Sequence, residues 1–158
     1  MIESDSFHTD DGIEIAWREM GQGRPLLLIH GFMSEADTNW IKYGHAAALA
    51  LHARNLGGPA ICFQLLDFPM LDDRTCTLAE PHPFTGEFVW TGERNHFGWK
   101  ALLGVEPGSD GVDETAAPAR ASDLSGLPPA FLHVGTLDLF LEENLEYARR
   151  LTRAGVPV

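Results

Sequence analysis

The sequence predicts an α/β fold in which helices flank a largely parallel sheet. Two observations lead to this expectation. Short apolar runs typical of buried strands occur near both ends of the chain, and a segment with a helical pattern follows several of them. Glycine or proline separates many of these segments. Strands that alternate with helices are typical of parallel sheets, because a parallel connection needs a crossover.

The first half of the chain predicts three strands and one helix. Apolar and polar or small side chains alternate over residues 13–17, as in a half-buried strand. The apolar run of residues 25–29 is typical of a strand buried on both faces. Alanine and leucine dominate residues 40–54, which predict a helix that Gly57 ends. Residues 60–66 predict the third strand.

The stretch of residues 66–129 holds seven of the ten prolines and seven of the sixteen glycines, and it predicts little regular structure. Only residues 95–103 have a helical pattern. A long irregular stretch is uncommon inside a compact domain. We therefore expect one of two things. Either the stretch packs as a lid or excursion against another part of the protein, or the part that it would normally pack against is missing.

Regular structure returns at the end of the chain. Residues 130–134 predict a strand, residues 135–138 a turn and residues 141–153 a helix. Acidic residues at its start and arginines at its end suit the helix dipole. Its expected apolar face consists of Leu141, Leu145, Ala148 and Leu151 or Thr152. A further strand is expected to begin at residues 156–158.

Composition narrows the class of protein. The 158 residues are 44% hydrophobic and 22% charged, which fits a globular domain, and the net charge is −12. Such a charge repels phosphate, so we expect neither nucleic acid nor an anionic membrane surface as a partner. No apolar run is long enough to span a membrane, and the acidic N-terminus differs from a signal peptide. Cys62 and Cys76 are expected to be free thiols, with a single bridge as the alternative. We expect a cytoplasmic location.

Two segments are candidates for chemistry. His30, Gly31 and Phe32 follow a predicted strand, where backbone N–H groups can stabilise an oxyanion. The alternative is a tight turn that needs glycine. Asp138 follows the predicted strand of residues 130–134, where a carboxylate can orient a histidine. The alternative is an acid that caps the next helix.

The C-terminal part resembles a known family. The string DLSGLPPAFLHVGTLDLF, with ALHARNLGGPAICFQLLDFPMLDDR and GWKALLG before it, is similar to hormone-sensitive-lipase-like carboxylesterases of the α/β-hydrolase superfamily. The resemblance implies that Asp138 is the acid of the catalytic triad. Residues 11–50 resemble a different esterase and lipase branch, whose His-Gly-aromatic oxyanion motif matches His30, Gly31 and Phe32.

The sequence also departs from the family pattern. It contains no Gly-x-Ser-x-Gly nucleophile motif, and no histidine follows Asp138. We therefore expect one partial α/β-hydrolase domain over residues 1–158, chimeric or internally deleted and truncated. Its segments are residues 1–50, with the N-terminal strands, oxyanion loop and first helix, and residues 51–158, which reach the triad acid and the following helix. The expected join lies near Ala47 to Leu51.

The resemblance implies a carboxylic ester hydrolase with a serine acyl-transfer mechanism, small ester substrates and no cofactor. Because the serine motif and the histidine are missing, we expect negligible turnover by this chain alone. The alternative is a non-catalytic remnant that binds a partner or associates with itself. A triad built from Ser34, one of the histidines and Asp138 is a further alternative. No metal site is expected, because the spacing of the residues that might form one matches no zinc pattern. These residues are Asp72, Asp73, Cys76, His82 and His96.

Overall fold

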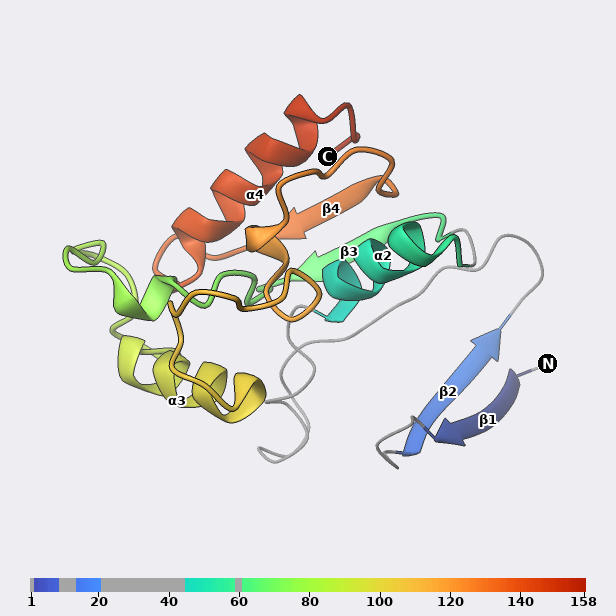
Figure 1. Cartoon of the computed structure of the whole chain (residues 1–158), viewed down its shortest axis with the longest axis horizontal. Helices are drawn as coiled ribbons and strands as arrows, with labels where there is room; N and C mark the ends of the chain where they lie inside the picture. Colours follow the sequence, from blue (N-terminus) through green and yellow to red (C-terminus); the bar gives the residue numbers. More distant parts are fainter. Residues whose placement is uncertain (1, 9–13, 21–44, 59–60) are drawn as a thin grey trace.

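The computed structural model describes residues 2–8, 14–20, 45–58 and 61–158. It contains two separate two-stranded sheets (Figure 1). Strands β1 (Ile2–His8) and β2 (Glu14–Met20) pair antiparallel, from Ile2 opposite Met20 to His8 opposite Glu14. Strands β3 (Gln64–Asp67) and β4 (Ala130–His133) pair in parallel. The parallel pair confirms the expected α/β organisation of the C-terminal part.

The N-terminal hairpin differs from the prediction. The strand expected at residues 13–17 is β2, which begins at Glu14 and ends at Met20. Its partner β1 was not predicted, because residues 3–6 are all polar and form neither an alternating pattern nor an apolar run. The strand expected at residues 25–29, and the beginning of the helix expected over residues 40–54, lie outside the described residues.

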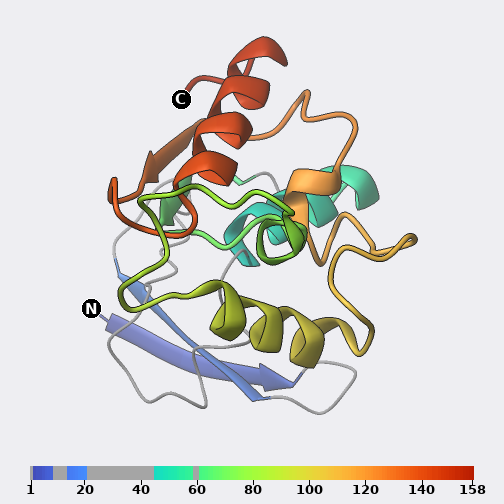
Figure 2. The ribbon, with the colours of Figure 1, turned by 90° about the vertical axis from the view of Figure 1, so that its left-hand side faces the viewer.

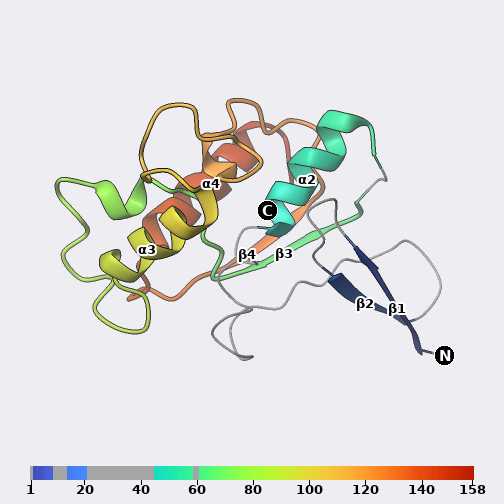
Figure 3. The same cartoon turned by 60° about the horizontal axis from the view of Figure 1, so that its bottom comes forward.

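Helices α2 (His45–Leu56) and α4 (Leu141–Arg153) cover the same face of β3 and β4 (Figure 3). The shared core contains Leu51 from α2, Leu66 from β3, Ala130 from β4, and Tyr147 and Leu151 from α4. Burying these side chains is the main stabilising contribution to this half of the structure. It places the carboxyl ends of both strands beside the start of α4.

Glycine ends α2 as expected. Gly57 has a φ of 62°, in the left-handed region that glycine adopts without strain. The N–H of Gly58 donates to the carbonyl oxygen of Ala53 at 2.8 Å, and the N–H of Gly57 donates to that of Arg54 at 3.2 Å. The strand that follows is shorter than predicted: β3 begins at Gln64 instead of residue 60.

The irregular middle stretch folds around a second small core. Buried Met70, Trp90, Trp99, Ala117 and Phe140 pack together, and Trp99 comes from α3 (Gly92–Leu103). Figure 2 shows α3 and α4 on opposite sides of the loops between them. The stretch also contains two short 3₁₀ helices, η1 (Thr75–Thr77) and η2 (Pro118–Arg120). Helix α3 is the one predicted over residues 95–103, and it begins three residues earlier.

Helix α4 has the predicted bounds, but the predicted buried face is right only in part: Leu151 is buried as expected. Leu145 is 60% exposed, and the residues that α4 buries are Glu143, Asn144, Tyr147 and Leu151. The large ring of Tyr147 and the polar contacts of Glu143 and Asn144 with the loop after β3 set the helix orientation. After α4, the carbonyl oxygen of Pro157 accepts from the N–H of Ala130 at 2.9 Å, but residues 156–158 are not assigned as a strand.

Candidate active site

Asp138 lies in the turn between β4 and α4, at the carboxyl edge of the parallel sheet as expected. Its Oδ1 accepts from the backbone N–H of Phe140 at 2.8 Å, and its carbonyl oxygen accepts from the N–H of Leu141 at 3.2 Å. The carboxylate therefore also stabilises the turn that leads into the helix. The alternative that Asp138 caps the helix is wrong, because the N-cap residue of α4 is Phe140 and, among the described residues, no side chain caps this helix.

The electrostatic setting of Asp138 is that of a half-buried acid. Burial raises its pKa above the ordinary value, and the hydrogen bond from Phe140 partly opposes this effect. Within the described part of the chain, Oδ2 of Asp138 has no hydrogen-bond partner. One carboxylate oxygen thus supports the turn, while the other is available to a further donor.

Asp138 lines a pocket of about 380 Å³ in which most of the exposed surface is apolar. Three segments meet there: the end of β3, the residues before α3 and the turn after β4. The lining residues are Phe68, Phe88, Val89, Trp90, Gly135, Thr136, Leu137 and Asp138. A mostly apolar pocket with a few polar groups, here Thr136 and Asp138, is the usual form of a small-molecule site.

Phe68 forms one wall of this pocket, and sequence reasoning missed it. It directly follows β3 with a φ of 48°, an uncommon backbone conformation for a residue other than glycine. Its N–H donates to the carbonyl oxygen of His133 at 2.7 Å, and its ring meets the His133 ring edge-on at 5.0 Å. No sequence pattern identifies Phe68, because its place depends on how β3 and β4 pair.

The structure brings no histidine to the pocket among the residues it describes. His133 is exposed on β4, where its Nδ1 lies 2.7 Å from Oδ1 of Asp67. His96 pairs with Glu106 at 3.2 Å, and Nδ1 of His82 accepts from the N–H of Phe84. The other predicted site residues, His30, Gly31 and Phe32, and also Ser34, lie outside the described residues.

Three of the side chains considered for a metal site form ion pairs with other residues. Asp73 pairs with Arg120, Asp72 with Arg74, and His96 with Glu106. Among the residues that the structure describes, no group of three or more His, Cys, Asp and Glu side chains is placed to hold a metal ion.

Neither Cys62 nor Cys76 forms a disulfide bond, as expected. Burial raises the pKa of Cys76 to about 11, so this thiol remains protonated at neutral pH. None of the helices in the described ranges is long and apolar enough to cross a membrane.

Comparison with known proteins identifies the family. Residues 44–158 match the model of a family described as having the alpha/beta hydrolase fold. Esterase LipI of Mycobacterium tuberculosis is 33% identical over 117 residues, and carboxylesterase NlhH of the same species is 35% identical over 121 residues. The matches cover 72% of this chain, which spans about a third (35%) of the length of these two relatives.

Solved structures agree with this result. A bacterial heroin esterase has a TM-score of 0.65 and 39% identity, over 71% of this chain and 36% of its own. A thermostable esterase from Pseudomonas putida has a TM-score of 0.58 and 33% identity, over 72% of this chain and 35% of its own. With the parallel β3–β4 pair and its two helices already established, these matches show that the chain belongs to the α/β-hydrolase family, among relatives that are esterases.

Proposed function

We propose that this chain derives from a carboxylic ester hydrolase and that Asp138 is the acid of its Ser-His-Asp triad. The observation that carries the proposal is the position of Asp138, at the carboxyl edge of the sheet and in the wall of an apolar pocket. Its relatives are named esterases. The substrate class is a small ester, whose apolar part suits this pocket, and the chemistry needs no cofactor.

In this mechanism a serine attacks the ester carbonyl and a histidine takes its proton. The free oxygen of Asp138 accepts from the histidine, which holds the ring in the productive tautomer. Backbone donors around Gly31 and Phe32 stabilise the oxyanion. The sequence contains no Gly-x-Ser-x-Gly and no histidine after Asp138. We therefore propose that this polypeptide alone has negligible turnover.

Hydrolysis of a short-chain p-nitrophenyl ester by the purified protein tests the proposal, with Asp138→Ala and the control Glu142→Ala. Glu142 is an exposed acid on the first turn of α4, so its removal takes away the same charge without touching the pocket. We expect a rate at background for all three proteins. Activity that only Asp138→Ala abolishes would refute the proposed lack of turnover. Ser34 and the histidines would then be the candidates for the nucleophile and the base. Activity that Asp138→Ala leaves unchanged would remove Asp138 from the chemistry.

The domain organisation is part of the proposal. We propose one partial hydrolase domain that joins residues 1–50 of one branch to residues 51–158 of another, near Ala47 to Leu51. The match to the family model begins at residue 44, close to this join. Sequencing the source locus tests it: an uninterrupted frame that encodes Gly-x-Ser-x-Gly between residues 50 and 51 would refute a deletion. We also propose a cytoplasmic location, which the two cysteines outside any disulfide bond support.

A second candidate function is self-association without catalysis. Phe131 is 53% exposed on the face of β3 and β4 opposite the core. Parallel sheets are normally covered on both faces, so a large exposed ring on such a sheet favours contact with another apolar surface. We propose a second copy of the chain as the partner.

Size-exclusion chromatography with light scattering tests this candidate. We expect a dimer or larger species that Phe131→Lys converts to monomer. The matched control is Leu145→Lys, which introduces the same charge at an exposed leucine on α4. A monomeric starting protein, or equal effects of the two variants, would refute association through this face.

A further inference from the structure

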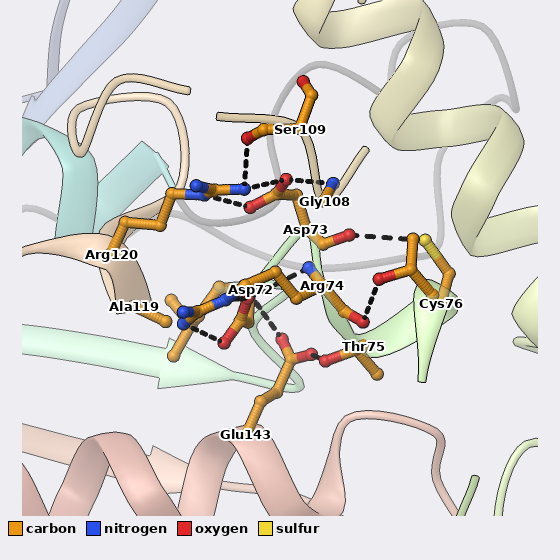
Figure 4. A network of polar contacts seen from close by, with 12 residues as sticks. Asp72, Asp73, Arg74, Thr75, Cys76, Gly108, Ser109, Ala119, Arg120 and Glu143 are labelled. Carbon is orange, nitrogen blue, oxygen red and sulfur yellow. Dashed lines mark hydrogen bonds and ion pairs between the residues drawn. The ribbon is translucent and has the colours of Figure 1, made fainter. Parts of the chain in front are cut away.

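A buried polar network connects the loop after β3 with the start of α4 (Figure 4). Glu143, in the first turn of α4, is at its centre. Its Oε1 accepts from the backbone N–H of Leu71 at 2.6 Å and of Asp72 at 3.3 Å, and its Oε2 accepts from the hydroxyl group of Thr75. These contacts join residues about seventy positions apart in the sequence.

Asn144 adds a second connection beside Glu143. Its side-chain NH₂ group donates to the carbonyl oxygen of Pro69 at 2.9 Å and to that of Phe140 at 2.8 Å. Both side chains are almost fully buried. Adjacent residues of α4 thus hold the backbone of the loop after β3 at both of its ends.

This network lies beside the pocket, because each of the two segments it joins directly follows one of the pocket walls. Phe68 immediately precedes the loop that Glu143 and Asn144 hold. Phe140, whose carbonyl oxygen Asn144 contacts, donates its N–H to Oδ1 of Asp138. The contacts of Glu143 and Asn144 therefore link the segment that follows Phe68 to the helix that follows Asp138.

We propose that Glu143 is a positioning residue, whose carboxyl group holds the loop of Leu71 to Thr75 against α4 and thereby fixes Asp138 at the pocket. Burial of an acid is unfavourable unless its hydrogen bonds compensate, and three donors meet this group. An acid that only stabilised the helix N-terminus would serve equally well at the exposed position of Glu142. The functional meaning of this positioning rests on the proposed role of Asp138. The hydrogen bonds of Glu143 themselves do not depend on that role.

Burial raises the pKa of Glu143 to about 8, and the nearby Asp72 carboxylate adds to this rise against the hydrogen bonds from Leu71 and Thr75. At neutral pH the carboxyl group is therefore mostly protonated. A glutamine has the same shape and is also uncharged. It retains an oxygen that accepts from Leu71 and Asp72, and its NH₂ group donates to the Thr75 hydroxyl oxygen. Glu143→Gln is thus the conservative variant, and Glu143→Ala removes the connection.

Nuclear magnetic resonance of protein with ¹³C-labelled aspartate carboxyl groups measures the effect, with Asp138 assigned from the signal lost in Asp138→Asn. We expect Asp138 to titrate above the ordinary aspartate range in the unsubstituted protein, in Glu143→Gln and in the control Glu142→Ala. In Glu143→Ala the pKa of Asp138 falls toward the ordinary value as solvent reaches it. Exchange of the Phe140 amide hydrogen accelerates about tenfold or more, while that of Leu66 in β3 does not.

A folded Glu143→Ala protein with unchanged Asp138 titration and Phe140 exchange would overturn the proposal. If Glu143→Ala does not fold, Thr75→Val, which removes one donor without changing the side-chain shape, is the test, and Thr75→Ser is its control. We expect Thr75→Val to accelerate Phe140 exchange selectively, and equal exchange in both variants would refute the positioning role. These readouts need no turnover, so they are independent of the esterase assay.

Discussion

At the scale of single residues, Asp73 shows how the structure accommodates a buried charge. Its carboxylate is fully buried and binds Arg120 through two hydrogen bonds of 2.6 and 2.8 Å, and it also accepts from the N–H of Gly108 at 2.7 Å. Burial alone would raise the pKa of Asp73, but the contacts with Arg120 and Gly108 outweigh this effect and hold it below the ordinary value. The pair connects the loop after β3 to η2.

Breaking the pair of Asp73 and Arg120 should strongly destabilise the folded state. Arg120→Met leaves Asp73 buried without its cation, and we expect the free energy of unfolding to fall by about 3–5 kcal/mol. The control is Arg74→Met, which breaks the neighbouring pair with Asp72, where the arginine is half exposed. This pair should contribute about 0–1 kcal/mol. Urea unfolding measures both, and similar losses would contradict the distinction between buried and exposed pairs.

The sequence did not predict these pairings. Asp73 and Arg120 lie 47 positions apart, and Leu71 and Glu143 lie 72 apart. Local periodicity carries no information about such contacts, because they depend on how the elements pack. The turn acid Asp138 was identified, since a strand, a glycine turn and a helix mark its position within a few residues. Phe68 and Trp90 were not predicted as pocket walls, because their positions also depend on how the elements pack.

At the scale of elements, helix ends were predicted better than helix faces. The bounds of α4 follow from its acidic start, its arginine-rich end and Gly155. Its buried face was predicted only in part, because hydrophobicity placed Leu145 inward beside Leu151 and did not indicate that Glu143 is buried. The start of α3 was placed too late, since Thr91, which caps the helix by accepting from the N–H of Arg94 at 3.3 Å, was not recognised.

The two glycines at the ends of α3 should respond in opposite ways to alanine. Gly104 follows the helix with a φ of 68°, so Gly104→Ala should lower the free energy of unfolding by about 1–2 kcal/mol. Gly92 is the first helical residue, its φ is not positive, and a Cβ there would meet no atom within 4 Å. Gly92→Ala should raise the free energy of unfolding by about 0.4–1 kcal/mol, because alanine lowers the conformational entropy of the unfolded chain. Thermal unfolding measures both shifts, and shifts of equal sign would contradict this assignment.

At the scale of the whole molecule, Glu143 should make stability depend on pH. Its pKa of about 8 in the folded chain lies above the ordinary value of 4.5, so the folded state retains a proton that the unfolded state has released. The contribution of Glu143 to the free energy of unfolding is therefore largest below about pH 4.5. It falls as the pH rises and is lost by about pH 8. We expect the urea midpoint to decrease over this range, and to decrease less in Glu143→Gln. A parallel decrease in both proteins would assign the effect to other groups.

The turn contact of Asp138 has a consequence for how such a chain changes over evolutionary time. Its carboxylate oxygen accepts from the N–H of Phe140, so natural selection for folding alone preserves an oxygen-bearing side chain at this position. Under the proposed role of Asp138, a hydrolase that loses its serine therefore remains under pressure to keep its acid. Asparagine would satisfy the same turn without a charge. Under the same proposed role, replacement of Asp138 by asparagine would remove the triad acid while it retains the turn.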